Sequence, residues 1–295
     1  MNENRSGLVL IDKPVGVTSF KALSSVKKAL KNKKAGHAGT LDKFASGLLI
    51  VAIGGYTRLI SVFEGLEKEY EGTICFGKTT ATLDPEGAFE GDAPLPSLSV
   101  LESVLPLFQG EIDQVPPVFS AIHVDGKRAY QRRLAGEDVK MKPRKVTIHE
   151  IRLIEWDEPF LSIRVKCSKG TYIRALARDI GEACGSLAYL SSLRRTGIGK
   201  FSVSDAVSPE KFDPRKDLCN PEGMLKNIPH IGIRYMKEET VLKIRNGVPF
   251  QDSWISPAPE EDVTGLLDED GGLLALIERK DGRWKYRMVI PGGFR

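Results

Sequence analysis

The sequence lacks several features that would indicate a particular class of protein. Its four cysteines include no pair with the C-x-x-C spacing of a zinc site. It has neither a phosphate-binding P-loop nor a Gly-rich dinucleotide fingerprint. No apolar run approaches the roughly 18 residues of a membrane span. Low-complexity tracts and internal repeats are also missing. These absences argue against zinc-dependent, nucleotide-driven and membrane-embedded proteins.

Cysteine use and the N-terminal residues favour the cytoplasm. Three of the four cysteines lie in apolar contexts that are typical of buried thiols, and unpaired thiols suit a reducing compartment. Positions 1–6 are polar, and the apolar run 8–11 that follows is too short for the core of a signal peptide. We therefore expect a cytoplasmic protein that does not bind a membrane.

The charge of the chain is small in total but clustered. Its 295 residues, enough for one large or two ordinary domains, carry a formal net charge of +4. Basic residues concentrate at 27–34, 127–145 and 169–195. Such clusters would bind a polyanion if they converged on one face, although any one of them could simply be a solvated surface.

The segment 36–49 is the strongest candidate for a reactive site. Glycines alternate there with polar side chains, among them His37 and Asp42, and the apolar run 48–53 predicts a buried strand behind them. Glycine permits positive φ and close approach of a ligand. A carboxylate in such a loop can be presented rigidly. The alternative is that Asp42 caps a turn and His37 is an ordinary loop residue.

Hydrophobic periodicity predicts elements along the whole chain. The predicted strands are 7–11, 48–53, 69–76, 146–156, 160–167, 273–277 and 284–290, and 193–203 is predicted as a further strand or a hairpin. Helices are predicted after Thr18 or Ser19, after Thr171, and at 57–63, 99–108 and 237–245. The remaining predictions are loops at 77–98 and 208–230, a hairpin turn at Asp125-Gly126 and a protruding basic arm at 127–145.

Arg174 is unusual for its position. It lies in the first turn of the helix predicted after Thr171, where the helix dipole disfavours a cation. A carboxylate or phosphate partner would explain an arginine there. A solvent-exposed arginine, costing only some tenths of a kcal/mol, is the alternative.

Six segments resemble, in order, the motifs of the bacterial TruB family of tRNA pseudouridine synthases. They are an opening motif at 7–20, a catalytic loop at 36–42, a tyrosine motif at 68–70, the start of an RNA-gripping insertion at 114–130, an arginine motif at 167–174 and an active-site segment at 193–199. The tail after about residue 230 resembles, more loosely, a PUA-like module. The chain departs from the family pattern at Ala38, where threonine is usual, at Lys43, where proline is usual, and after Tyr130.

The resemblance implies an α+β fold. Its mixed, mainly antiparallel central sheet would be flanked by helices, as in the pseudouridine synthase fold, with a small β-rich C-terminal PUA-like module. The catalytic domain would comprise 1–225, including a basic RNA-gripping insertion at about 120–145. The PUA-like RNA-binding module would comprise 230–295.

The resemblance also implies an isomerase that converts uridine 55 in the T-loop of tRNA to pseudouridine. The base would be flipped out, its N1–C1′ bond broken and C5 joined to C1′, without a metal or other cofactor. Asp42 would be the essential carboxylate, acting by attack at C1′ or by assisting elimination through C2′. The implied substrate-binding residues are His37, Tyr70, Tyr172, Arg174 and Leu193. Arg174 would keep Asp42 ionised.

The expected partner is the T-arm of tRNA, bound by a monomer without a guide-RNA particle. Two alternatives stay open. Archaeal and eukaryotic relatives with a similar loop act inside guide-RNA particles, although the basic arm favours the stand-alone type. The other alternative is an RNA-binding or RNA-folding protein without catalysis, against which the joint presence of Asp42, Tyr70 and Arg174 argues.

Overall fold

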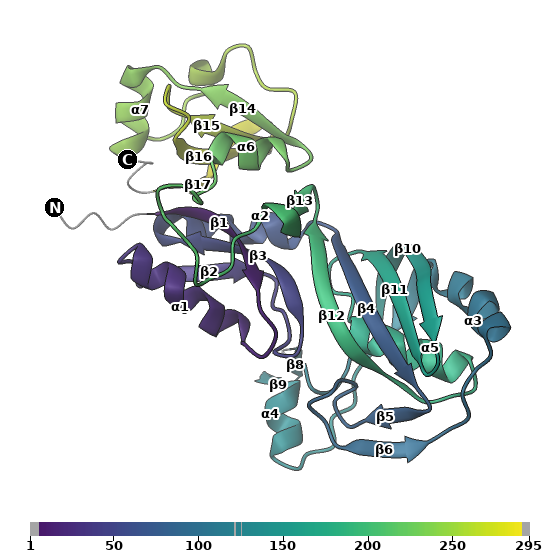
Figure 1. Ribbon diagram of the computed structural model, residues 1–295. Helices are drawn as coiled ribbons and strands as arrows, with labels where there is room; N and C mark the ends of the chain where they lie inside the picture. Colours follow the sequence, from purple (N-terminus) through teal and green to yellow (C-terminus); the bar gives the residue numbers. More distant parts are fainter. Residues whose placement is uncertain (1–5, 121, 125, 291–295) are drawn as a thin grey trace. The chain divides into compact units, whose positions relative to one another are not determined.

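A computed structural model describes residues 6–120, 122–124 and 126–290 and divides into two compact units (Figure 1). The first unit comprises Met1–Asp42, Gly47–Leu66 and Ile198–Arg295, and the second comprises Lys43–Ser46 and Glu67–Gly197. Within the described ranges, no helix combines the length and apolar character needed to span a membrane.

Strand β3 (Ser46–Ile53) organises the first unit. Both β1 (Gly7–Lys13) and β2 (Ala35–Ala38) pair with it in antiparallel register. Side chains at alternating positions of β1 and β3 are buried on both faces, so the two strands lack the polar face of a half-solvated sheet. The strands predicted at 7–11 and 48–53 are confirmed, whereas β2 was not predicted.

Helix α1 (Ser19–Ala29) covers one face of β1 and β3. Thr18 is its N-cap, and the Thr18 side chain accepts a hydrogen bond from the Lys21 backbone N at 3.2 Å. The helix predicted after Thr18 or Ser19 is confirmed, and periodicity in the sequence assigns Phe20, Leu23 and Val26 to its apolar face. Leu23 and Val26 are buried against the sheet, but Phe20 is 71% exposed, so its assignment was wrong. Phe20 lies roughly a quarter turn from the centre of the apolar stripe, so it points past the edge of the sheet.

Four strands form a separate sheet near the C-terminus. Their order is β14 (Ile231–Tyr235), β15 (Val263–Leu267), β16 (Leu273–Lys280) and β17 (Arg283–Val289). The β14–β15 pair is parallel and the others are antiparallel. The predicted strands at 273–277 and 284–290 and the predicted helix, α7 (Glu238–Arg245), are confirmed. Glycines interrupt the apolar runs of β14 and β15, which is why periodicity did not predict them.

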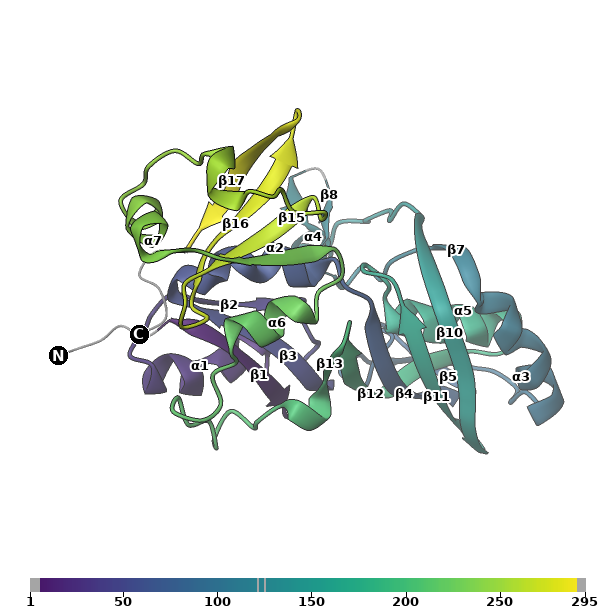
Figure 2. The same ribbon diagram turned by 90° about the horizontal axis from the view of Figure 1, so that it is seen from above.

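The C-terminal sheet packs on the face of β1 and β3 opposite α1 (Figures 1 and 2). Helix α6 (Pro221–Lys226) contributes to this core through Met224 and Leu225. The Asn220 side chain caps α6 by accepting from the Glu222 backbone N at 2.8 Å. The prediction that 208–230 is a linker was therefore wrong for α6, whose short length gave no periodic signal.

The second unit is built on antiparallel strands with one polar and one buried face. Strand β4 (Lys68–Phe76) pairs with β11 (Phe160–Cys167), which pairs with β10 (Arg144–Asp157), and β7 (Gly110–Gln114) follows. Strand β12 (Ala188–Ile198) lies on the other side of β4. The predicted alternation in β11 is confirmed, because its odd-numbered residues from 161 to 167 are buried.

Helix α5 (Ile173–Ala183) is the buried helix predicted after Thr171. Its N-cap is Tyr172 and not Thr171, because the Thr171 hydroxyl donates to the Ser168 carbonyl at 3.0 Å. Gly185, with φ +68°, follows its last turn, where left-handed backbone favours glycine.

The predicted loop at 77–98 contains the hairpin of β5 (Lys78–Thr80) and β6 (Phe89–Asp92). All four residues of β6 are exposed, so no core pattern marked the hairpin. The remaining elements are α2 (Ile60–Glu64), α3 (Leu98–Val104), β13 (Phe201–Ser202) and 3₁₀ turns at Gly54–Leu59, Leu105–Phe108, Val203–Asp205 and Asp252–Ile255.

The predicted basic arm contains regular structure. Strands β8 (His123–Val124) and β9 (Lys127–Arg128) pair as a hairpin and lead into α4 (Ala129–Leu134). Asp125 of the predicted turn lies outside the described residues. The arm also has buried residues, Ala129 and Val139, so the expectation that it carries little core was wrong at these positions.

The four cysteines are free thiols. Cys75 and Cys167 are buried, whereas Cys184 and Cys219 are half-buried, so two rather than three are fully enclosed. Burial raises the pKa of the Cys167 thiol, and that of Cys219, to about 11. Thiols of such high pKa are protonated at neutral pH and suit packing rather than nucleophilic chemistry.

Candidate active site

Asp42 lies in an irregular segment between β2 and β3 and is half-buried. Gly39 precedes it with φ +79° and Gly47 follows it with φ +107°, values that strongly favour glycine. The glycine-rich pattern therefore has the backbone role that the sequence predicted. His37 lies on β2, opposite Val51 of β3, and is part of the sheet rather than a loop.

A buried serine anchors the residue before Asp42. The Ser19 hydroxyl accepts a hydrogen bond from the Leu41 backbone N at 2.9 Å and donates to the Leu41 carbonyl at 3.0 Å. Ser19 is the first residue of α1, and both residues are buried. One hydroxyl thus satisfies both backbone groups of Leu41 and fixes the chain from which the Asp42 carboxylate projects. Sequence reasoning treated Ser19 only as a possible helix cap.

Replacing Ser19 by alanine is expected to lower the free energy of unfolding by about 1–3 kcal/mol, because both buried backbone groups of Leu41 lose their partner. Urea unfolding measures the change. Ser24→Ala is the matched control on the same helix, since Ser24 is exposed and we expect it to change stability by less than about 0.5 kcal/mol. Equal stability of the two variants would contradict the anchoring role of Ser19.

Arg174 lies in the second unit, in the first turn of α5, and is only 5% exposed. Its guanidinium forms an ion pair with the Asp84 carboxylate at 3.1 Å. It also donates to the carbonyl oxygens of Thr82 at 2.9 Å and Phe119 at 3.0 Å. A carboxylate partner therefore accounts for the arginine in this turn, as the sequence suggested. The sequence named Asp42, which belongs to the first unit, so that pairing stays a prediction.

Asp84 is a site residue that sequence reasoning missed. Its carboxylate is buried and accepts hydrogen bonds from the Thr82 hydroxyl at 2.5 Å and the Glu86 backbone N at 3.0 Å. The preceding residue, Leu83, has φ +63°, a strained value for a non-glycine residue. An aspartate before proline in a polar segment looks like an ordinary turn residue, so its sequence context does not indicate that Asp84 is buried.

A second reciprocal pair of hydrogen bonds holds the start of α5. The Gln114 side chain accepts from the Tyr172 backbone N at 2.8 Å and donates to the Tyr172 carbonyl at 3.1 Å. Gln114 is fully buried at the end of β7. The Tyr172 side chain is half-buried, with the Arg144 guanidinium 5.9 Å from its ring centre. Gln114 therefore fixes the backbone two residues before Arg174.

Tyr70 and Leu193 lie on the same face of the second unit's strands. Tyr70 is half-buried on β4 opposite Val165, and Gly72, two positions on, shares its face. A Cβ at Gly72 would lie 3.2 Å from Cδ1 of Leu190 and 3.5 Å from Cδ1 of Leu193. Both leucine side chains therefore pack on the face that Gly72 shares with Tyr70.

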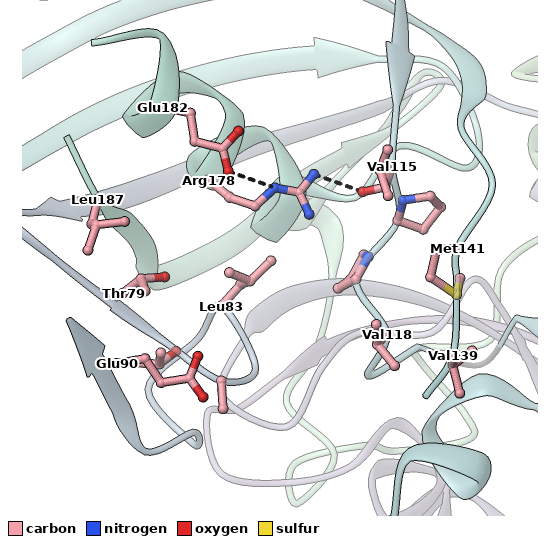
Figure 3. Close-up of a pocket in the computed structure, with 14 residues that line it drawn as sticks. Thr79, Leu83, Glu90, Val115, Val118, Val139, Met141, Arg178, Glu182 and Leu187 are labelled. Carbon is pink, nitrogen blue, oxygen red and sulfur yellow. Dashed lines mark hydrogen bonds and ion pairs between the residues drawn. The ribbon is translucent and has the colours of Figure 1, made fainter. Parts of the chain in front are cut away.

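A cavity of about 440 Å³ lies in the second unit, with Leu83 among the residues that line it (Figure 3). Leu83 and Met141 contribute to its apolar walls, and Arg178 reaches across it from α5. Arg178 forms an ion pair with Asp179 at 2.6 Å and donates to the Val115 carbonyl at 2.9 Å. Its charge is thus compensated within the protein. None of the residues predicted to bind substrate lines this cavity, which we regard as separate from the candidate site.

Comparisons with known proteins agree with the motifs. The family model described as TruB family pseudouridylate synthase (N terminal domain) matches residues 27–173. The protein named tRNA pseudouridine synthase B from Borreliella burgdorferi (strain ZS7) is 40% identical over 288 residues, covering 97% of this chain and 99% of the relative. Its namesake from Borrelia garinii subsp. bavariensis is 45% identical over 290 residues, with the same coverage.

Solved structures show the same fold. The chain of a Cbf5–Nop10–Gar1 complex matches with a TM-score of 0.68 and 24% identity, covering 98% of this chain and 85% of that one. A chain of the archaeal box H/ACA sRNP Nop10–Cbf5 complex gives 0.69 and 23%, covering 98% and 88%. The predicted α+β fold, with a mainly antiparallel sheet and a small C-terminal sheet module, is thereby confirmed. Alignment over 97% of the chain with curated relatives that are 40–45% identical shows that the chain belongs to the TruB family of pseudouridylate synthases.

Proposed function

We propose that this protein converts uridine 55 in the T-loop of tRNA to pseudouridine. The observation that carries the proposal is the 40% identity, over 288 residues, to a protein named tRNA pseudouridine synthase B. The glycine-flanked Asp42, on a backbone fixed by Ser19, supports it, because a catalytic carboxylate must be held rigidly.

In the proposed reaction, Asp42 is the essential carboxylate, and it must be ionised at neutral pH to act. Arg174 would favour the ionised form, since a guanidinium within reach lowers the pKa of a carboxylate. The planar guanidinium has five N–H donors, so it can serve Asp84 and a second carboxylate at once. Asp84 would then hold Arg174 in place rather than contact the substrate.

Tyr70, Leu193, His37 and Tyr172 are proposed to form the remainder of the uridine site. Tyr70 lies against the uracil ring in this proposal, and Leu193 packs beside it, consistent with their shared face. The phenol of Tyr70 is also a candidate to assist removal of the C5 proton late in the reaction. His37 contacts the RNA and helps to hold the flipped nucleotide.

The proposed substrate must be unstacked before it reacts. Flipping a base out of a folded RNA loop costs a few kcal/mol, which contacts to the RNA backbone must offset. The basic residues at 120–145 and the C-terminal sheet are the proposed sources of these contacts, in a catalytic domain at 1–225 and an RNA-binding module at 230–295. We propose that the protein acts in the cytoplasm as a monomer, binding the T-arm without a guide-RNA particle.

The test uses a tRNA transcript carrying 5-³H-uridine and the purified full chain without partners. Forming the C5–C1′ bond must release the C5 hydrogen, so tritium release in step with pseudouridine at position 55 is the expected result. A transcript with cytidine at position 55 is the control and should release no tritium. Wild-type protein that binds tRNA but releases none would favour a binding or RNA-folding role, or a need for missing partners.

A further inference from the structure

One segment of the first unit is strongly basic. The 29 residues from Lys13 to Leu41 contain seven lysines and no acidic residue. The other strongly basic segment, 127–145, has eight basic and two acidic residues. Positive charge without any acidic residue therefore distinguishes α1 and its flanks.

Among the residues that the structure describes, six of these seven lysines have no carboxylate partner. Lys13 is the exception, since it is buried and donates to the carbonyl oxygens of Pro14 and Val17 at 3.0 and 2.7 Å. Within residues 6–120, 122–124 and 126–290, no carboxylate pairs with the others, which are Lys21, Lys27, Lys28, Lys31, Lys33 and Lys34. Lysines elsewhere commonly are paired, such as Lys166 with Glu67 at 2.9 Å. The lysines of α1 thus keep their charge available to a partner.

An aromatic ring lies among them. Phe20 is exposed on the first turn of α1, and the Lys27 ammonium is 5.3 Å from the centre of its ring. Positions 20, 24 and 27 are spaced by three and four residues, so they lie along one side of the helix, next to its buried stripe. Lys31 follows the C-cap residue Leu30 and is exposed. An exposed ring flanked by cations is the combination that binds RNA, through base stacking and phosphate contacts.

Helix stability alone does not explain this pattern. Lysines 27 and 28 suit the helix dipole, because they lie in the last turn. Lys21 does not, because it lies in the first turn, where acidic residues are favoured and none occurs. A comparable exposed ring, Phe89 with Lys78 5.8 Å from its centre, has the acidic neighbours Glu90 and Asp92. The exposed ring on α1, by contrast, has no acidic residue between Asp12 and Asp42.

The exposed lysines and Phe20 of α1 begin close to Asp42 in the structure. Ser19, the residue before Phe20, holds the Leu41 backbone through two hydrogen bonds, so the start of α1 lies beside the Asp42 segment. We propose that the exposed surface of α1 and of the residue after its C-cap, formed by Phe20, Lys21, Lys27, Lys28 and Lys31, is a tRNA-binding surface additional to the basic residues at 120–145. This inference rests on the proposed function, and it assigns phosphate contacts to the lysines and a stacking contact to Phe20.

The test measures tRNA affinity against salt concentration for the full chain. Lys28→Gln/Lys31→Gln is expected to raise Kd on the order of tenfold near 0.1 M salt. It should also lower the slope of log affinity against log salt by roughly one and a half, because each phosphate contact contributes about 0.7–0.9. Phe20→Ala should raise Kd by on the order of tenfold with no change of slope, since stacking releases no counterions.

Matched controls occur in the second unit. Lys78→Gln/Lys166→Gln removes the same charge from lysines that have carboxylate partners, and Phe89→Ala removes an equally exposed ring. Both should leave Kd within about twofold of the wild-type value. The single-turnover rate at saturating protein should be unchanged in both control variants, because neither touches the proposed site or the α1 surface.

The outcomes separate the two proposals. Unchanged Kd and slope in the α1 variants, with wild-type protein that isomerises tRNA, would overturn the α1 surface alone. If the α1 variants and the control variants lost the same affinity, the α1 surface would be overturned as well, because the loss would then reflect the change in total charge only. A wild-type protein that releases no tritium would overturn the proposed function, whatever the affinity of the α1 variants.

Discussion

Asp42→Asn is expected to lower the rate of tritium release by about 10⁴-fold or more, while tRNA affinity stays within a few-fold of wild type. Loss of a group that acts covalently or as the essential base removes a step that the rest of the site cannot replace. The amide keeps the size of the side chain, and the segment stays anchored through Ser19. Single-turnover assays and binding to unmodified tRNA measure the two quantities separately.

Asp205→Asn is a suitable control for the Asp42 variant. Asp205 is an exposed carboxylate of the same unit and lies outside the proposed site, so its amide should release tritium at the wild-type rate. An Asp42→Asn protein that retains more than about one hundredth of the wild-type rate would show that another group supplies the chemistry. A parallel loss of affinity would instead assign Asp42 to binding.

Breaking the Arg174–Asp84 pair is expected to destabilise the protein by about 3–5 kcal/mol. Both side chains are almost fully buried, and removal of one partner leaves the other as an uncompensated buried charge. Arg174→Met and Asp84→Asn should each show this loss in urea unfolding. The double variant should lose clearly less than the sum, because it leaves no buried charge unpaired.

Arg164 and Glu71 provide the matched comparison for this cycle. They form an ion pair at 2.7 Å in the same unit, but their side chains are 49% and 41% exposed. Solvent screens such a pair, so Arg164→Met should change stability by less than about 1 kcal/mol. Additive effects of Arg174→Met and Asp84→Asn, or losses no larger than that of Arg164→Met, would contradict a structural role for the buried pair.

Sequence patterns predicted the elements whose burial repeats along the chain. The continuous apolar run at 48–53 and the alternation at 160–167 each follow from the burial of one strand against a core, so periodicity was sufficient to predict these strands. Short exposed strands such as β6 have no buried face and therefore no periodic pattern. Helix α6 was missed for a related reason, because only two turns of chain contribute to its buried face.

The candidate site was predicted less completely because its supports join distant positions. Asp42 was recognised from its local glycine pattern and the resemblance. The bond from Gln114 to Tyr172 spans 58 residues, and the bonds of Arg174 to the Thr82–Asp84 turn span about 90. No local pattern encodes such a contact, so Gln114 and Asp84 looked like ordinary polar residues of a strand and a turn.

The concentration of positive charge on α1 also affects how the protein meets a polyanion. The first unit carries +7 over these 29 residues and −3 over its remaining residues, and this asymmetry gives the unit an electric dipole moment. In the field of an RNA, the unit experiences a torque that turns its positive end toward the phosphates before contact. Encounters that present an acidic segment of the unit, such as 260–270 with six acidic and no basic residues, are disfavoured by repulsion. The small net charge of the protein is therefore compatible with fast, orientation-selective association at low ionic strength.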